Sequence, residues 1–237
     1  VRAVALVLAL VVTLVSGVRD VLTIVAILAV SFAAAATLAD VVTGIRARQR
    51  TTGEPLWRAA ARSILIGRQR YGGLIVHFGI ALIGAGIIAS GLFQTAITVS
   101  LKPGDSFELA GNVVTLRGVE DANGPGYSGR VAALSVSKDG VPLTEMRPEK
   151  RFYRVRSMAT TEIAIRSSLA GDLYMVAGDE TAQGGIVLRG YWNPLVNWIW
   201  AGWLVVALGA LLSLSSARRR RAPRAVSATG IEGVPAE

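Results

Sequence analysis

The sequence contains no cysteine and only one histidine, His77, among its 237 residues. Without cysteine the chain can form no disulfide, offer no thiolate nucleophile and bind no metal through a Cys side chain. Charged residues are also scarce, at 17% of the composition, whereas 52% of the residues are hydrophobic and the mean hydropathy is +0.49. This balance indicates an α-helical integral membrane protein with one modest polar portion.

Acidic residues are outnumbered, since 25 lysines and arginines stand against 16 aspartates and glutamates, which gives a net charge of +9. The basic residues gather at the ends of apolar segments. That distribution favours a role in membrane topology, with lipid as a partner, over binding to nucleic acid. The chain begins at Val1, directly in an apolar segment and without methionine, so we expect it to be the C-terminal part of a longer protein.

About four apolar segments have the composition of membrane spans, although the first, Ala3–Val18, is short. The clearest is Leu74–Phe93, a run of 20 residues without charge, which suffices to cross roughly 30 Å of hydrocarbon. We therefore divide the chain into two spans in residues 1–45, a basic loop with an amphipathic helix in 46–73, a third span in 74–93, a β domain in 94–190, a fourth span in 191–215 and a basic tail in 216–237.

The loop between the second and third spans carries one acidic residue, Glu54, and seven arginines: Arg46, Arg48, Arg50, Arg58, Arg62, Arg68 and Arg70. By the positive-inside rule this loop is cytoplasmic, so the β domain lies on the outer side and the arginine-rich tail returns to the cytoplasm. Within the loop, the spacing in Leu56–Ile66 predicts an amphipathic helix on the inner membrane surface, with Trp57 as an anchor. Ordinary interfacial anchoring is the favoured interpretation, and a site for anionic lipid is the alternative.

The β domain alternates short β-type runs with turn signals. One such run is Val113–Val119. Two others, Arg130–Ser137 and Val141–Met146, flank the turn residues Asp139-Gly140, and this arrangement predicts a β-hairpin. At roughly 95 residues the region can hold one small all-β core, either a barrel or a sandwich. Its carboxylates show no catalytic spacing, so we interpret most of them as solvated surface groups.

His77 lies about one turn inside the apolar run and is the candidate cofactor ligand. An imidazole in hydrocarbon needs a partner, because an unsatisfied polar group there costs several kcal/mol. It could be a metal ligand, above all to haem iron, or a proton relay, or it could simply be hydrogen-bonded to a neighbouring helix. Gly72, Gly79 and Gly86 recur every seven residues and form a smooth face for another helix or a flat cofactor.

Three stretches carry a family resemblance when they are taken together: RYGGLIVHFG (70–79), RPEKRFY (147–153) followed by TEIAI and DLY, and YWNPLVNWIW (191–200) followed by LGALL. They resemble the C-terminal part of the CcmF/CcsA haem lyase family of cytochrome c maturation proteins. The histidine stretch alone is a weak signal, whereas the order and spacing of the others are specific. The resemblance covers nearly all of the chain from Arg68 to Arg221.

The resemblance implies a function in cytochrome c-type biogenesis, in which haem is joined through its vinyl groups to the cysteines of a CXXCH motif in apocytochrome c. The implied location is the periplasmic face of the bacterial cytoplasmic (inner) membrane. His77 matches the second of two membrane histidines that ligate haem b in the family, so the resemblance implies that His77 is an axial ligand of haem iron. Implied partners are the upstream part of the family protein, other maturation proteins and apocytochrome c.

Several features of the family are absent from this sequence: the tryptophan-rich haem-presenting region, the first membrane histidine and two outer histidines. We therefore expect a fragment or a naturally split subunit, which alone neither completes a six-coordinate haem b site nor performs the lyase reaction. We assign no catalytic residue. The alternative function is a non-catalytic membrane scaffold whose β domain docks partner proteins of an assembly complex.

Two further groups of side chains allow two interpretations each. Lys150, Arg151 and Arg154 could meet haem propionates or a partner protein. We favour a structural interpretation, in which Phe152 and Tyr153 alternate faces of a strand, one of them enters the core, and the charges are solvated. The aromatic residues of the last span could sit at the outer headgroup boundary, or they could form a shelf for a haem edge or for a partner helix (Tyr191, Trp192, Trp198, Trp200 and Trp203).

Overall fold

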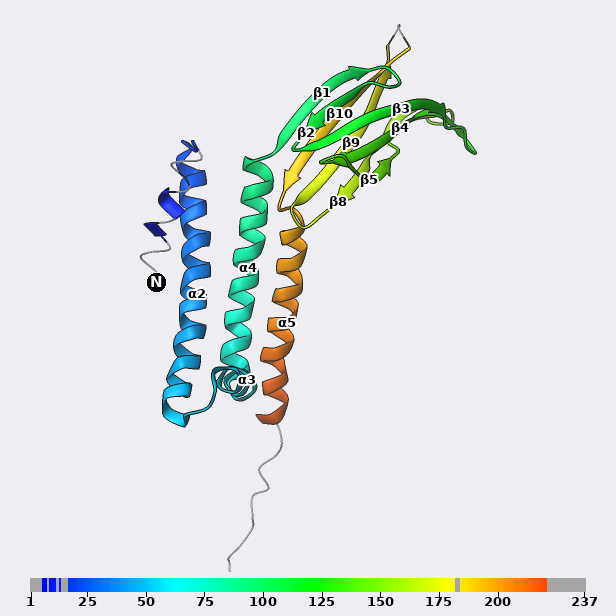
Figure 1. Ribbon diagram of the computed structural model, residues 1–237. Helices are drawn as coiled ribbons and strands as arrows, with labels where there is room; N and C mark the ends of the chain where they lie inside the picture. Colours follow the sequence, from blue (N-terminus) through cyan, green and yellow to red (C-terminus); the bar gives the residue numbers. More distant parts are fainter. Residues whose placement is uncertain (1–5, 8, 12, 14–16, 182–183, 221–237) are drawn as a thin grey trace, which may run out of the picture.

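The computed structural model describes residues 6–7, 9–11, 13, 17–181 and 184–220 (Figure 1). Three long helices stand side by side, with a β domain at one end and a short helix at the other. The long helices are α2 (Val21–Thr52), α4 (Arg68–Leu92) and α5 (Asn197–Arg220), and the short helix is α3 (Leu56–Ile66).

Each long helix contains a segment long and apolar enough to cross a membrane: Val21–Thr52, Arg68–Leu92 and Asn197–Ser215. The protein is therefore a helical membrane protein, and its β domain is inserted between the helices α4 and α5. The span expected over Ala3–Val18 falls largely on residues outside the described ones. The other three expected spans correspond to the three long helices.

Helix α2 is longer than the expected second span. It continues past Ile45 to Thr52 and so includes part of the expected loop. Arginine is a good helix former, and Arg50 in the last turn interacts favourably with the helix dipole. The helix ends at Gly53, whose left-handed backbone (φ 67°) suits glycine. The third span also begins earlier than expected, because helix α4 starts at Arg68 and not at Leu74.

The expected start of the last span at Tyr191 is wrong. Tyr191 and Trp192 belong to strand β10 (Ile186–Pro194), where they pair with Ala96 and Thr95 of strand β1. The aromatic pattern of this stretch suits a strand as well as a membrane interface, and the strand pairing decides between them. Helix α5 begins only at Asn197.

The β domain is a sandwich of two antiparallel sheets and not a barrel. One sheet has the order β1-β10-β9-β8, and the other has the order β2-β3-β4-β6-β7 with β5 paired to β4. Besides β10, the strands are β1 (Thr95–Leu101), β2 (Ser106–Leu109), β3 (Asn112–Asp121), β4 (Tyr127–Lys138), β5 (Val141–Met146), β6 (Glu149–Tyr153), β7 (Met158–Glu162), β8 (Ala164–Ser167) and β9 (Gly171–Glu180).

Alternating side chains of both sheets fill the space between them. Leu173, Met175 and Ala177 of β9 point inward and meet residues of β3 and β4 such as Leu116 and Leu134, all of them buried. The expected hairpin is confirmed, since β4 and β5 pair on either side of Asp139-Gly140. Both turn residues have positive φ, 52° and 78°, as a tight hairpin turn of the Asp-Gly kind requires.

Candidate functional site

The glycine face of α4 packs against α5. A methyl group placed on Gly79 would lie 2.8 Å from the carbonyl oxygen of Gly202, and one on Gly72 would lie 2.6 Å from that of Gly209. The backbones of the two helices therefore touch at two levels, one for each pair of glycines, which small residues allow in membrane helix pairs. Helix α5 occupies the place that a flat cofactor would need on this face.

His77 lies on a different side of α4. At about 100° of rotation per residue, it is roughly 150° around the helix from Gly72 and Gly79. Its side chain is exposed on the surface of the described helices. The histidine is therefore accessible to a ligand, or to another protein segment, from the membrane side.

The imidazole of His77 is held by its own helix. Its Nδ1 lies 2.8 Å from the carbonyl oxygen of Gly73, one turn earlier. A carbonyl oxygen can only accept a hydrogen bond, so Nδ1 carries the proton and donates. In the neutral ring Nε2 then keeps its lone pair, and metal-bound histidines commonly show this arrangement, with one nitrogen fixed by a carbonyl and the other on the metal.

One axial position of a haem iron is compatible with this geometry. The ring is oriented and accessible, and in the described part of the chain its Nε2 has no hydrogen-bond partner, which is costly in hydrocarbon. The sequence offers no second histidine. Among the described residues, no three His, Cys, Asp or Glu side chains gather where they could hold a metal ion. A bis-histidine iron site therefore needs a ligand from another protein segment.

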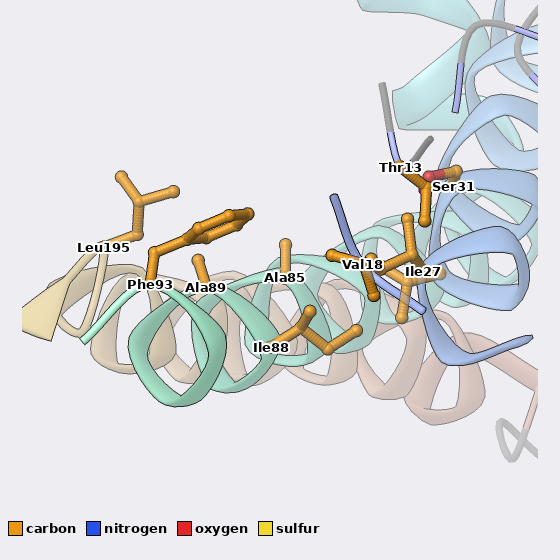
Figure 2. Close-up of a pocket in the computed structure, with 10 residues that line it drawn as sticks. Thr13, Val18, Ile27, Ser31, Ala85, Ile88, Ala89, Phe93 and Leu195 are labelled. Carbon is orange, nitrogen blue, oxygen red and sulfur yellow. The ribbon is translucent and has the colours of Figure 1, made fainter. Parts of the chain in front are cut away.

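An apolar pocket of about 230 Å³ lies between α2 and α4, near the β domain (Figure 2). Ten residues line it: Thr13, Val18, Ile27, Val30, Ser31, Ala85, Ile88, Ala89, Phe93 and Leu195. Ala85 is eight residues beyond His77, about 12 Å along the helix, so the pocket is separate from the histidine. Its lining suits hydrocarbon and offers no group for acid–base chemistry.

The basic side chains of β6 are paired with carboxylates. Lys150 binds Asp179 of the opposite sheet, and Arg151 contacts Glu149 at 2.7 Å and Glu162 at 3.3 Å. The hydrogen bond to Glu149 is the main cause that raises the pKa of Arg151 above its usual value. Because these two positive charges are compensated, β6 provides little free charge for haem propionates. Arg154, in the turn after β6, is exposed and forms no ion pair with another described residue.

The expectation that Phe152 or Tyr153 enters the core is wrong. Phe152 is 45% exposed, and Tyr153 is half-buried with its ring centroid 5.6 Å from that of Tyr127. These residues lie at the end of the sandwich where ion pairs, rather than apolar side chains, join the two sheets. There Arg130 of β4 binds Glu180 of β9.

Polar contacts fix the β domain to the membrane helices. Asn197, the first residue of α5, donates to the carbonyl oxygen of Ser168 (2.8 Å) and to Oδ1 of Asp172 (2.7 Å). The indole of Trp198 donates to the carbonyl oxygen of Leu169 (3.2 Å). These bonds hold the turn between β8 and β9 against the start of α5, which couples the domain to the helix.

Sequence reasoning missed the structural role of Asp172, because it treated most carboxylates of the β domain as solvated. In the structure Asp172 is only 5% exposed. Its partner Asn197 is 25 positions away in the chain, and no local pattern links the two. The pair becomes visible only once the sandwich brings β9 to the start of α5.

Comparison with known proteins places this architecture in a family. Residues 92–194, from the end of α4 to the end of β10, match the family described as the CcmF C-terminal beta-sandwich. The cytochrome c-type biogenesis protein ccl1 of Rhodobacter capsulatus is 38% identical over 188 residues, which are 77% of this chain and 28% of that protein. The cytochrome c-type biogenesis protein CcmF of Escherichia coli is 38% identical over 151 residues, 64% of this chain and 23% of that protein.

A solved structure shows the same similarity. The chain resembles the structure named "Cytochrome c Heme Lyase CcmF" with a TM-score of 0.67 and 25% sequence identity, over 90% of this chain and 33% of that one. The present chain thus spans about a quarter of the length of the curated relatives that it matches. It belongs to the CcmF family and corresponds to the C-terminal part of that family's proteins.

Proposed function

We propose that this chain acts in cytochrome c biogenesis, as the C-terminal portion of a haem lyase component that contributes to covalent attachment of haem to apocytochrome c. Its relatives are named cytochrome c-type biogenesis proteins, and the solved structure that it resembles is named a haem lyase. Since the chain covers only about a quarter of those relatives, it works together with the upstream part of a family protein, with other maturation proteins and with apocytochrome c.

Within that assembly, His77 supplies one axial ligand of a haem b in the membrane. The observation that carries this proposal is the exposed imidazole in the apolar part of α4, with its Nδ1–H bonded to the Gly73 carbonyl. That hydrogen bond fixes the tautomer and the ring orientation, so Nε2 is ready to bind iron. When bound, the haem supplies an iron centre that passes electrons or stabilises the helices.

The chain spans the bacterial inner membrane with its β domain on the periplasmic side. Supporting this orientation, the arginine-rich segment from Arg46 to Arg70 lies at the end of the helices remote from the β domain (Figure 1). Short connecting loops rich in arginine stay on the cytoplasmic side of bacterial membranes.

A difference spectrum, reduced minus oxidised, tests the role of His77. The chain is co-expressed with the upstream segment of a family protein and purified in detergent. We expect a b-type Soret band that His77→Ala abolishes. Ile80→Ala is the matched control, because Ile80 is another exposed side chain of the same helix (55%), and it should leave the band intact. Unchanged haem content in His77→Ala would refute the assignment.

The scaffold function remains the second candidate. It is favoured by the hydrogen bonds through which Asn197 of α5 holds the β domain. A rigid domain with compensated charges suits docking of partner proteins. Under this alternative, cytochrome c assembly fails when the β domain is deleted, although His77→Ala changes neither haem content nor assembly. The two functions therefore give opposite results for His77→Ala.

A further inference from the structure

Helix α3 lies across the bundle at the end remote from the β domain. In Figure 1 it is seen end-on, whereas the long helices are seen from the side. Its axis is therefore close to perpendicular to theirs, which places it along the plane of a membrane that the long helices cross. An amphipathic helix in that orientation lies at the boundary between headgroups and acyl chains.

The faces of α3 agree with this location. Ala59 and Ser63 are buried against the other helices. Leu56 and Trp57 are 54% and 67% exposed, and they lie about 100° apart on a neighbouring apolar face that needs hydrocarbon around it. Arg58 follows at the edge of that face, with its guanidinium carbon 4.9 Å from the centroid of the Trp57 ring. The arginine is therefore directed to the headgroup layer when Trp57 is in the interface.

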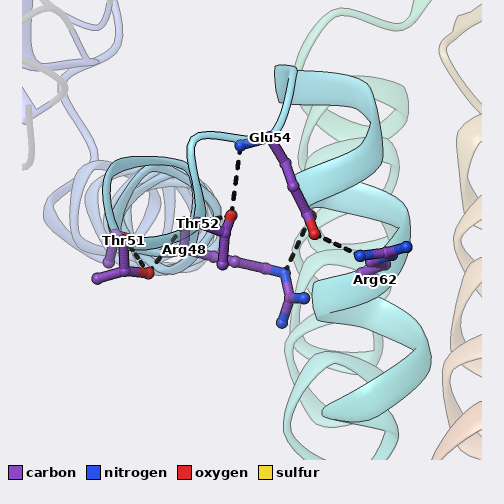
Figure 3. A network of polar contacts seen from close by, with 6 residues as sticks. Arg48, Thr51, Thr52, Glu54 and Arg62 are labelled. Atoms are coloured by element: carbon purple, nitrogen blue, oxygen red, sulfur yellow. Dashed lines mark hydrogen bonds and ion pairs between the residues drawn. The ribbon is translucent and has the colours of Figure 1, made fainter.

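One carboxylate fixes the corner between α2 and α3. Glu54 binds Arg62 of α3 and lies 3.5 Å from Nε of Arg48 of α2 (Figure 3). The backbone N–H of Glu54 also donates to the hydroxyl of Thr52 (3.4 Å), which in turn donates to the Arg48 carbonyl (2.9 Å). The corner is thus held in one conformation, and Glu54 is already engaged by two arginines.

The remaining arginines of this corner keep their charge uncompensated. Arg46, Arg50 and Arg58 are exposed, and none of them forms an ion pair with another described residue. Arg46 and Arg50 are four residues apart and so lie on one face of the last turns of α2. They are about 160° around the helix from Arg48, which reaches toward Glu54 and α3, so they lie on the side of α2 away from α3. Three fixed positive charges therefore lie at the level of the headgroups, one on α3 beside its apolar face and two on the outer side of α2.

We propose that Arg46, Arg50 and Arg58, together with the apolar face of α3, form a binding surface for acidic phospholipids, with separate lipid molecules at α2 and at α3. We name this surface the basic corner. The guanidinium groups bind the phosphate and the net negative charge of the headgroup, while Leu56 and Trp57 contact the acyl chains. A zwitterionic headgroup lacks that net charge, so the basic corner selects phosphatidylglycerol over phosphatidylcholine. This site is independent of any haem.

Native mass spectrometry of the full chain in neutral detergent, with equal amounts of the two lipids, tests the proposal. We expect retention of phosphatidylglycerol in preference to phosphatidylcholine. Each basic residue near an acidic lipid surface changes affinity roughly fivefold, so Arg50→Gln with Arg58→Gln should weaken phosphatidylglycerol binding about fivefold at each of the two helices and leave phosphatidylcholine binding unchanged. Arg189→Gln is the matched control, because Arg189 is exposed on the β domain.

A second measurement tests the position of α3 without any change of charge. In vesicles that contain brominated phosphatidylcholine, the wild-type tryptophan fluorescence should include a quenched component that Trp57→Phe removes. Equal retention of the two lipids by the wild type, or unaltered phosphatidylglycerol binding by the double variant, would overturn the lipid site. Quenching that is identical in Trp57→Phe would overturn the interfacial location of α3.

Discussion

The close contact between α4 and α5 predicts that Gly79→Ala destabilises the helical part of the protein. A methyl group at Gly79 would lie 2.8 Å from the Gly202 carbonyl oxygen, 2.8 Å from Cγ2 of Val206 and 2.9 Å from the Val206 nitrogen. Carbon in good contact lies about 3.5–4.0 Å from its neighbours. Two of the three neighbours are backbone atoms, which cannot rotate away, so α5 itself must shift outward.

Gly73→Ala on the same helix is the matched control, because a methyl group there would have no neighbour within 4 Å and the Gly73 carbonyl stays in place. The gain in helix propensity, up to about 1 kcal/mol, is common to both substitutions and cancels in their difference. The difference between the two variants is therefore the cost of overpacking, which we expect to be about 1–3 kcal/mol.

Equilibrium unfolding in detergent, followed by tryptophan fluorescence, measures this difference, since Trp198, Trp200 and Trp203 are on α5. The double variant Gly79→Ala with Gly202→Ala should lose less than the sum of the single losses, because both methyl groups separate the same pair of backbones. If Gly79→Ala unfolds at the same midpoint as Gly73→Ala, the two helices do not touch as described and the reasoning fails.

Three other predictions concern the β domain and its orientation. Asn197→Ala leaves the buried carboxylate of Asp172 without its amide donor, so we expect a loss of about 1–3 kcal/mol and faster hydrogen exchange in the turn between β8 and β9. Gly140→Val places a β-branched residue at φ 78°, which should cost about 1–2 kcal/mol in thermal unfolding of the domain. A reporter fused after Asp139 should be active in the periplasm and one fused after Arg50 in the cytoplasm, and the reverse pattern would contradict the proposed orientation.

The differences between expectation and structure have a common physical origin in long-range pairing. Tyr191 and Trp192 suit a membrane interface and a strand equally well by residue type, and their pairing with β1 places them in the sandwich. Phe152 and Tyr153 alternate as a strand requires, yet β6 lies where ion pairs join the sheets and neither ring enters the core. Strand alternation predicts which residues share a face but does not predict what covers that face.

The sequence by itself determined the class of the protein, because apolar length, arginine clusters and turn residues are local signals that need no knowledge of distant contacts. It also singled out His77 and the seven-residue glycine repeat. Only the tertiary structure decided that the glycines meet α5, that His77 lies away from that contact, and that Asp172 is buried at the junction with the helices. Each of these depends on which elements become neighbours, and neighbours far apart in the chain leave no local pattern in a single sequence.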